Sequence, residues 1–361
     1  MKRFLSRVLP LLLSFGLILN CTGCSTVLVL AGKARENSEA SSSVISESSA
    51  SSGVISTPVP TEDGDLRAFY TDVANAESVT VMVYMIGSDL ESEDGSATDD
   101  LLEMADAALS ENVHLVLQTG GTETWWNDVC TDDESERFVI ENGDMTLLQS
   151  LGSMNMTDAD TLSDFIRFSA ESYPADRYEL ILWDHGGGTM TGFGYDELYE
   201  DTSLTLSSLS TALYNGGVQF DFIGFDACLM ATAEVAYALD PYADYLIASE
   251  ESEPGEGWAY KNWLTMLAED PAVPTAELGK KLADDFLEAY IFADMPTLSV
   301  LDLRYVPELY AALESYWGSA YTALQSGSYG AFSQVRNNVR EFGDNEYDQV
   351  DLSDLATLTK Q

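Results

Sequence analysis

Apolar and polar positions along the chain follow two alternating patterns. Short continuous apolar and β-branched runs, typical of strands buried on both faces of a sheet, alternate with longer amphipathic stretches of helical period. The runs that predict strands are residues 79–86, 113–117, 178–183, 220–225, 245–248 and 298–303. The stretches that predict helices are residues 99–109, 157–173, 229–239 and 274–291. This alternation predicts an α/β fold with a mostly parallel six-stranded sheet and helices on both faces.

Residues 122–150 fit neither pattern. They are predicted to contain a hairpin that turns at Asn142-Gly143, a dipeptide typical of tight turns between strands. In a parallel sheet, the ligand site lies outside the carboxyl ends of the strands. Candidate functional residues are therefore expected where the predicted strands end.

The amino-terminal segment differs from the rest of the chain. Three basic residues precede an apolar run at residues 8–19, and Gly23 stands directly before Cys24. This arrangement is typical of a secretory signal, and the run is shorter than the about 20 residues of a membrane span. It resembles a bacterial lipoprotein signal at residues 1–23, which implies lipidation of Cys24. A plain signal peptide cut nearby is the alternative.

The next segment, residues 24–75, is predicted to be a disordered tether, because it is rich in serine and has little apolar surface to bury. Residues 76–361 are numerous enough for one large domain. The pattern stops within a helical stretch at residues 354–359, so we expect the domain to be incomplete at its carboxyl end. A lipidated Cys24 followed by a tether predicts a protein at the bacterial cell surface, anchored to the membrane by lipid or secreted.

Charge excludes one class of partner. The chain has 61 acidic and 16 basic residues, which gives a formal net charge of −45. Such a chain repels nucleic acid and attracts cationic substrates. Acidic clusters at residues 89–100 and 196–201 offer oxygen ligands that are compatible with calcium, but neither has the spacing of a known calcium loop. No required cofactor and no metal site are therefore predicted.

Cysteine content points away from a disulfide scaffold. If Cys24 is the lipid anchor, Cys130 and Cys228 are the two cysteines that remain behind it. Two cysteines cannot form a disulfide framework, so they either pair with each other or stay free. We expect free thiols.

Two candidate catalytic residues follow predicted strands. His185 comes after strand 178–183 and opens a run of three glycines, whose backbone N–H groups can point at a ligand. Cys228 comes after strand 220–225, where the start of predicted helix 229–239 would favour the thiolate. Either residue alone is more typical of a structural role. Together, at one edge of one sheet, they predict nucleophilic catalysis by a thiolate with an imidazole as proton carrier.

Two further polar residues, His114 and Asp184, are not predicted to be catalytic. His114 lies at the amino end of its predicted strand, away from the expected site, and is predicted to be structural. Asp184 directly precedes His185, and strand alternation sends its side chain to the opposite face. We therefore expect a Cys-His dyad in which the backbone or another residue orients the imidazole.

Three motifs in this order resemble the clostripain family of cysteine peptidases. They are Asp184-His185-Gly186-Gly187, Asp226-Ala227-Cys228-Leu229-Met230 and the segment ASEESEPGEGW at residues 248–258. The opening strand, followed by Gly87-Ser88-Asp89-Leu90, fits the start of that family's catalytic domain. The resemblance covers residues 79–351 and implies a caspase-like fold, a three-layer sandwich, for a catalytic domain at residues 76–361.

The resemblance also implies roles for individual residues. His185 would be the general base and acid, and Cys228 the nucleophile of an endopeptidase that forms a thioester. The N–H groups of Gly186 and Cys228 would form the oxyanion hole. Members of the family cut after Arg or Lys, which requires acids in the pocket, and Asp226 and Glu256 match those positions. Glu256 stands at a position where aspartate is common in the family. The implied partner is a peptide or protein substrate with a basic P1 residue.

One departure from the family concerns maturation. Several members cut themselves after a basic residue between the histidine and the cysteine, but this chain has no Lys or Arg between Arg177 and Lys261. We therefore expect a single-chain enzyme, or else a specificity that is not basic. A catalytically inactive surface binding protein on the same scaffold is the alternative function, and acyl transfer to an amine is a third.

Overall fold

A computed structural model describes residues 66–199, 202–290, 296–343 and 349–359. The predicted signal at residues 1–23 and the predicted lipidation site Cys24 lie outside these ranges. The predicted tether is described only from residue 66 onward. No helix within the described ranges combines the length and the apolar character needed to cross a membrane.

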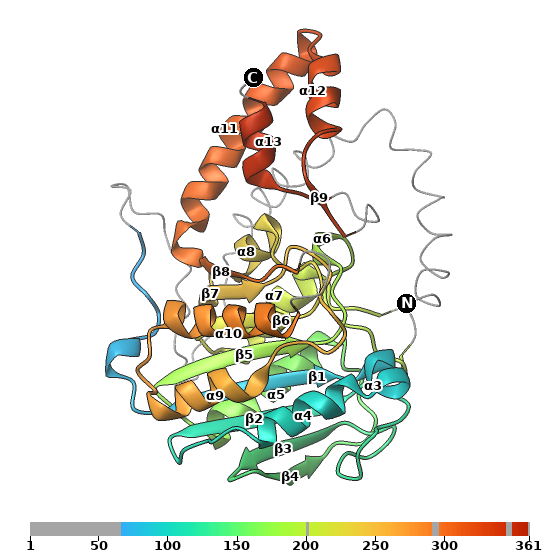
Figure 1. Ribbon diagram of the computed structural model, residues 1–361, viewed down its shortest axis with the longest axis vertical. Coiled ribbons are helices and arrows are strands. Elements are labelled where there is room, and N and C mark those ends of the chain that lie inside the picture. The colour runs from blue at the N-terminus through green and yellow to red at the C-terminus, as the bar shows by residue number, and fades with distance from the viewer. Residues whose placement is uncertain (1–65, 200–201, 291–295, 344–348, 360–361) are drawn as a thin grey trace, which may run out of the picture. The chain divides into compact units, whose positions relative to one another are not determined.

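An eight-stranded sheet forms the centre of the domain (Figure 1), in the order β4-β3-β2-β1-β5-β6-β7-β8. The strands β1, β2, β5, β6 and β7 are parallel, whereas β3, β4 and β8 pair antiparallel with their neighbours. The strands are β1 (Val79–Ile86), β2 (Val113–Gly120), β3 (Glu136–Glu141), β4 (Asp144–Ser150), β5 (Arg177–Trp183), β6 (Phe220–Asp226), β7 (Ala243–Ala248) and β8 (Ser299–Asp302).

The predicted mostly parallel α/β sheet is confirmed, but the predicted number of six strands is wrong. All six predicted strands are present, and the predicted hairpin at residues 122–150 adds β3 and β4 to the same sheet. β3 pairs with β2 and buries Phe138 and Ile140 in the core. No residue of β4 is buried, so β4 carries no continuous apolar run that could have predicted it.

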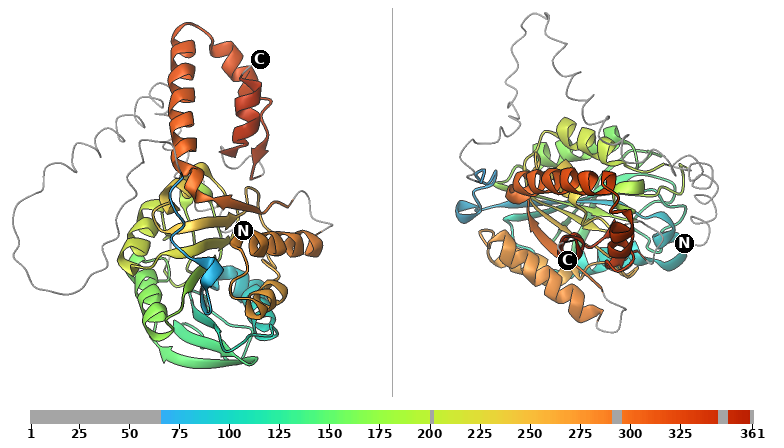
Figure 2. Two further views of the ribbon diagram at one scale, coloured as in Figure 1. Left: turned by 90° about the vertical axis from the view of Figure 1, so that its left-hand side faces the viewer. Right: turned by 90° about the horizontal axis from the view of Figure 1, so that it is seen from above.

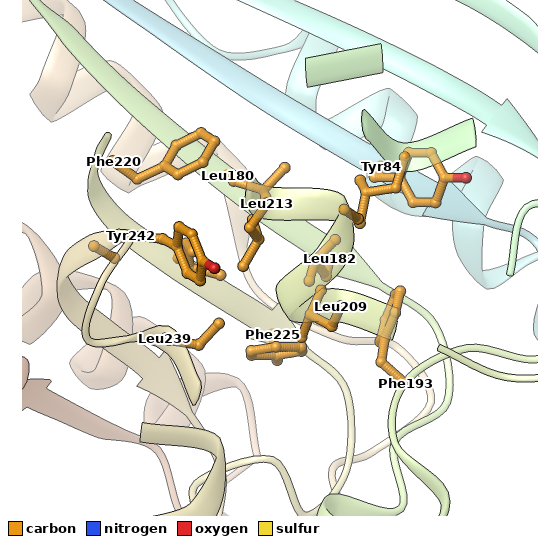
Figure 3. Close-up of a cluster of buried hydrophobic side chains, with 14 of the residues drawn as sticks. Tyr84, Leu180, Leu182, Phe193, Leu209, Leu213, Phe220, Phe225, Leu239 and Tyr242 are labelled. Carbon is orange, nitrogen blue, oxygen red and sulfur yellow. The ribbon is translucent and has the colours of Figure 1, made fainter. Parts of the chain in front are cut away.

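Helices cover both faces of the sheet, as Figures 1 and 2 show. One layer contains α5 (Ala159–Ser172), α7 (Leu206–Gly216) and α8 (Ala233–Leu239). The opposite layer contains α4 (Ser96–Ala105), α9 (Tyr260–Glu269) and α10 (Thr275–Ala289). Successive strand residues alternate between the two cores, so that Leu182 packs with α7 (Figure 3) and Trp183 lies in the opposite core. The predicted three-layer arrangement is confirmed.

The remaining elements connect or extend this sandwich. They are the 3-10 helices η1 (Val73–Asn75) and η2 (Leu303–Tyr305), the helices α3 (Ser88–Asp94), α6 (Gly188–Thr191), α11 (Val306–Gln325), α12 (Tyr329–Arg336) and α13 (Leu352–Leu358), and the short strands β9 (Glu341–Phe342) and β10 (Gln349–Val350). Helix α11 packs against α8, where the rings of Tyr310 and Tyr237 stack with their centroids 4.9 Å apart.

One predicted helix begins later than expected. The prediction started it at residue 229, but α8 starts at Ala233, where the hydroxyl of Thr232 accepts a hydrogen bond from the N–H of Val235. Ser, Thr, Asp and Asn are the preferred residues at this capping position. Cys228 therefore lies in a turn and not at a helix amino terminus. The predicted stabilisation of its thiolate by a helix dipole is wrong.

A buried ion cluster joins the amino ends of the central strands to the α9–α10 connection. Nε of Arg177 donates a hydrogen bond to Asp221 at 2.8 Å, and the guanidinium also donates to the carbonyl of Val273 at 2.9 Å and forms an ion pair with Asp221 at 2.7 Å. The side chains of Arg177 and Asp221 are almost fully buried. This cluster lies at the edge of the sheet opposite to the strand ends that carry His185 and Cys228.

Removing one partner of this cluster is expected to destabilise the fold. Asp221→Ala removes the acid that is hydrogen-bonded to Arg177 and leaves the buried Glu179, 3.2 Å away, as the acidic partner of the guanidinium. We expect the free energy of unfolding to fall by about 3 kcal/mol, the lower end of the range for a broken buried pair. Chemical denaturation measures this change. The matched control is Asp284→Ala on α10, because Asp284 is 58% exposed and pairs with Lys280, which is also exposed. Equal stabilities of the two variants would contradict the prediction.

Candidate active site

His185 and Cys228 leave neighbouring strands at corresponding positions. β5 and β6 pair in parallel with Trp183 opposite Asp226, and the N–H of Asp184 donates to the carbonyl of Asp226 at 3.2 Å. His185 and Cys228 each follow this pair by two positions, at the carboxyl ends of their strands. The structure thus brings the two sequence-predicted residues to one edge of the sheet.

The glycine run after His185 packs directly against the turn that holds Cys228. A Cβ atom added to Gly186 would lie 2.0 Å from the carbonyl oxygen of Cys228, and one added to Gly188 would lie 2.8 Å from that of Leu229. Only glycine permits so close an approach between two backbones. The segments that carry the imidazole and the thiol are therefore in contact.

Two backbone N–H groups at this contact have no acceptor in the part of the chain that the structure describes. No other residue in the described ranges accepts a hydrogen bond from the N–H of Gly186 or of Cys228, whereas the N–H of Gly187 donates to the carbonyl of Gly192 at 2.9 Å. An oxyanion hole requires unused donors held in fixed positions. The use of Gly186 and Cys228 for this purpose stays a prediction, with which their unused N–H groups are compatible.

The thiol of Cys228 is free and partly exposed. The N–H of Glu253 donates to its sulfur at 3.2 Å. Burial raises the pKa of Cys228, and the hydrogen bond from Glu253 only partly opposes this effect. The other free thiol, that of Cys130, is buried, and burial raises its pKa to about 12. Both thiols are free as predicted, and Cys228 is the one that a substrate can reach.

Backbone strain is located directly after the nucleophile candidate. Leu229 has a φ of 68°, its side chain is buried, and its N–H donates to the carbonyl of Glu251 at 3.1 Å. A residue other than glycine in this region costs about 1–3 kcal/mol, and such residues cluster at active sites. The surrounding contacts hold the turn of Cys228 in one strained conformation.

His185 has a carboxylate partner that the sequence did not reveal. Its Nε2 lies 2.7 Å from Oδ1 of Asp89 in the first turn of α3, and the two side chains are 28% and 21% exposed. The adjacent Asp184 is engaged elsewhere, since its Oδ2 accepts a hydrogen bond from the N–H of Tyr195. Burial raises the pKa of Asp184 to about 7. The signal that could have pointed to Asp89 is its position just beyond β1, the strand beside β5.

The two predicted pocket acids lie in different surroundings. Asp226 is buried at the end of β6, and its Oδ2 accepts hydrogen bonds from the N–H of Trp258 at 3.0 Å and from the hydroxyl of Tyr260 at 2.8 Å. Glu256 is exposed and lines a cavity of about 480 Å³, together with residues of α4 and with Tyr290. The wall of that cavity does not include Asp226. Of the two predicted pocket acids, Asp226 is therefore buried and Glu256 is accessible to solvent.

Asp226 belongs to a group of buried acids that have no basic partner. A Cβ atom added to Gly257 would lie 2.9 Å from both carboxylate oxygens of Asp226 and 3.0 Å from Oδ2 of Asp100. The carboxylate oxygens of Glu253 are buried and have no hydrogen-bond partner in the described part of the chain. No Lys or Arg of the described residues pairs with these three acids.

Burial is the largest cause that raises the pKa of Asp100, Asp226 and Glu253, and it raises that of Asp226 to about 6. Repulsion by Asp226 adds to this effect for both Asp100 and Glu253. Buried carboxyl groups without a cation are costly to keep ionised. They are typical of a site that receives its counter-charge from a ligand.

One acid in each cluster that is compatible with calcium accepts hydrogen bonds from the protein itself. Glu91 accepts hydrogen bonds from the N–H of Thr98 and of Trp126, and Asp196 accepts one from the N–H of Met156. Within the described ranges, no group of three or more His, Cys, Asp or Glu side chains is arranged to hold a metal ion.

His114 occupies the position expected for a structural residue. It lies near the amino end of β2, and its ring packs against that of Tyr173 with the centroids 5.3 Å apart. His185 lies beyond the carboxyl end of its own parallel strand, so the two histidines belong to opposite edges of the sheet.

Comparison with known proteins places this site in a family. A model of the clostripain family matches residues 83–361, which is most of the chain. The chain belongs to the clostripain family. Clostripain from Hathewaya histolytica is 35% identical to it over 123 residues, a match that covers 29% of this chain. That match spans only 23% of clostripain itself.

Solved structures show the same fold. A secreted C11 cysteine protease from Bacteroides thetaiotaomicron, in complex with an irreversible peptide inhibitor, is similar with a TM-score of 0.60 and 20% identity over 78% of both chains. An inactive zymogen C11 protease from Parabacteroides distasonis is similar with a TM-score of 0.58 and 24% identity, over 77% of this chain and 76% of that one. The predicted caspase-like fold is confirmed.

Proposed function

We propose that this clostripain-family protein is a cysteine endopeptidase in which Cys228 is the nucleophile and His185 transfers protons. The observation that carries the proposal is the contact between the two strand ends, where Gly186 packs on the carbonyl of Cys228. A thiolate and a proton carrier held in touching segments form the arrangement that nucleophilic catalysis needs.

The reaction follows from these positions. The proton of the Cys228 thiol passes to His185, and the sulfur bonds to the carbonyl carbon of the substrate to form a tetrahedral oxyanion. The N–H groups of Gly186 and Cys228 stabilise that charge. His185 then gives its proton to the leaving amine as the peptide bond breaks, and the resulting thioester is hydrolysed by water with His185 as the base.

We further propose that the protein cuts after Arg or Lys. Asp226, Glu253 and Asp100 are buried acids without a basic partner, and the backbone of Glu253 contacts the sulfur of Cys228. A cationic P1 side chain would supply the missing counter-charge next to the nucleophile. Glu256 adds an accessible acid on the same side of the sheet and would attract the cation.

Location and maturation complete the proposal. The sequence of residues 1–24 supports export and a lipid anchor at Cys24, and the similar protease from Bacteroides thetaiotaomicron is a secreted one. We place the protein at the bacterial cell surface. The absence of Lys and Arg between Arg177 and Lys261 supports a single-chain enzyme that does not cut itself there. We expect turnover without an added metal ion.

Peptides that differ only at P1 test the basic specificity. With P1 arginine, Asp226→Asn is expected to lower kcat/KM by about 30-fold or more, because losing one member of a buried charge pair costs about 2–5 kcal/mol. With P1 citrulline, which keeps the shape of arginine without its charge, the two proteins should react alike. A wild-type protein that cleaves citrulline and arginine peptides equally well would refute the specificity.

A further inference from the structure

Asp89 and His185 lie at the topological switch point of the sheet, between β1 and β5, where the strand order reverses. The chain leaves β1 toward β2 on one side, and β5 lies on the other side of β1 and leads on to β6. Ligand sites of open α/β sheets form at such switch points. Asp89 follows β1, His185 follows β5, and the distance from Nε2 of His185 to Oδ1 of Asp89 is 2.7 Å.

The backbone before Asp89 is held in an unusual conformation. Ser88 is fully buried and has a φ of 49°, in the left-handed region that residues other than glycine rarely adopt. The N–H of Gly87 donates to the carbonyl of Gly120 at 2.8 Å, and that of Ser88 to the carbonyl of Gly121 at 3.2 Å. These bonds fix the first turn of α3 on the end of β2. Asp89 is thereby presented to His185 by a rigid and strained turn.

The thiol needs such a partner because its own surroundings do not favour the thiolate. Cys228 lies in a turn before α8, and burial raises its pKa. Ionisation must therefore depend on the basicity of His185. Burial by itself would lower the pKa of His185, but the hydrogen bond to Asp89 and the charges of Asp184 and Asp89 raise it. The ring of Tyr195 also faces His185, with the centroids 6.4 Å apart.

The hydrogen bond also sets the tautomer of the imidazole. An ionised carboxylate can only accept hydrogen bonds, so Nε2 of neutral His185 carries the proton that it donates to Asp89. The basic nitrogen is then Nδ1. Burial by itself would raise the pKa of Asp89, whereas the hydrogen bond and the charge of His185 lower it, and the pKa lies below its ordinary value. Asp89 is therefore ionised at neutral pH.

We propose that Asp89 is the positioning residue of this site, which orients His185, directs its Nδ1 to the thiol and stabilises the imidazolium. The proton moves from the sulfur of Cys228 to Nδ1, and Asp89 itself takes no proton. This inference rests on the proposed function, because it assigns a partner to the proton carrier. It replaces the expected dyad with three cooperating side chains that follow the carboxyl ends of β1, β5 and β6.

Asp89→Asn tests the proposal with two readouts on the full chain. We expect kcat to fall about 10- to 100-fold with KM within about threefold, because the ring loses its orientation. We also expect alkylation of Cys228 by iodoacetamide to need a pH about one unit higher, because the imidazolium loses its stabilising charge. Asp89→Glu, which keeps the charge, should recover part of the lost kcat and part of the shift in the pH of alkylation. Asp94→Asn, an exposed position on the same helix, is the matched control.

The outcomes separate this inference from the proposed function. If Asp89→Asn keeps the kcat and the alkylation midpoint of Asp94→Asn, while Cys228→Ala is inactive, Asp89 has no positioning role and the peptidase proposal stands. A loss of kcat with a lowered melting temperature and an unchanged alkylation midpoint would show a structural role and also overturn the inference. If the wild-type protein cleaves no peptide, the proposed function fails, and an unchanged alkylation midpoint would then refute the inference independently.

Discussion

Cys228→Ala is expected to abolish peptide cleavage, with a fall in kcat of at least about 10⁴-fold. The substitution removes the atom that forms the thioester, and removing a nucleophile costs this much in enzymes of similar design. The side chain of Cys228 is partly exposed and lies in a turn, so the fold should be unaffected. Initial rates on a fluorogenic peptide, with active-site concentrations fixed by titration, measure the effect.

The second thiol provides the matched control for this experiment. Cys130→Ala removes a buried thiol whose pKa is about 12 and which belongs to a different loop. It should leave kcat unchanged and lower only the stability of the protein. Equal rates for the wild type and Cys228→Ala would contradict the assignment of the nucleophile. Loss of activity in Cys130→Ala, in a protein that remains folded, would contradict it as well.

Gly186→Ala is expected to lower kcat by about 10²- to 10³-fold. The added Cβ would lie 2.0 Å from the carbonyl oxygen of Cys228, a distance that forces the two backbones apart. Such a shift displaces the N–H of Gly186 from the oxyanion and the imidazole of His185 from the thiol. Loss of one oxyanion donor alone has an effect of this size. Steady-state kinetics should show the loss in kcat.

Gly318→Ala is the matched control for the added methyl group. Gly318 lies within α11, and a Cβ atom there meets nothing within 4 Å. Alanine is the better helix former, so this variant should keep full activity and gain at most about 1 kcal/mol of stability. Should Gly186→Ala retain wild-type kcat, the close approach of the two strand ends would have no part in catalysis.

The architecture could be predicted from the sequence where the chain is buried on both faces. The central strands consist of apolar residues because helices cover both sides of the sheet, so each one leaves a continuous run, as in Val79–Ile86. The hairpin strand Asp144–Ser150 faces solvent along its length and leaves no such signal. For this reason the parallel part of the sheet was predictable, but its full extent of eight strands was not.

The candidate site was predictable only in part, for a similar reason. His185 and Cys228 directly follow buried strands, so the pattern alone located both at one edge of the sheet. The late start of α8 depends on the side chain of Thr232, which caps the helix. The apolar residues before Thr232 fit the helical pattern, so the pattern alone placed the start too early. Asp89 also follows a buried strand, β1, but its contact with His185 depends on the lateral order of β1 and β5 and on the strained turn at Ser88, which the apolar pattern does not give.

Peptide mapping after reaction with an arginyl chloromethyl ketone tests the central claim most directly. We expect mass spectrometry to find one label per chain, attached to Cys228, and cleavage activity to fall in proportion to the label. His185→Ala should react far more slowly, because its thiol lacks the proton acceptor. A label on Cys130, or equal reaction rates with and without His185, would contradict the claim that this thiol and imidazole act together.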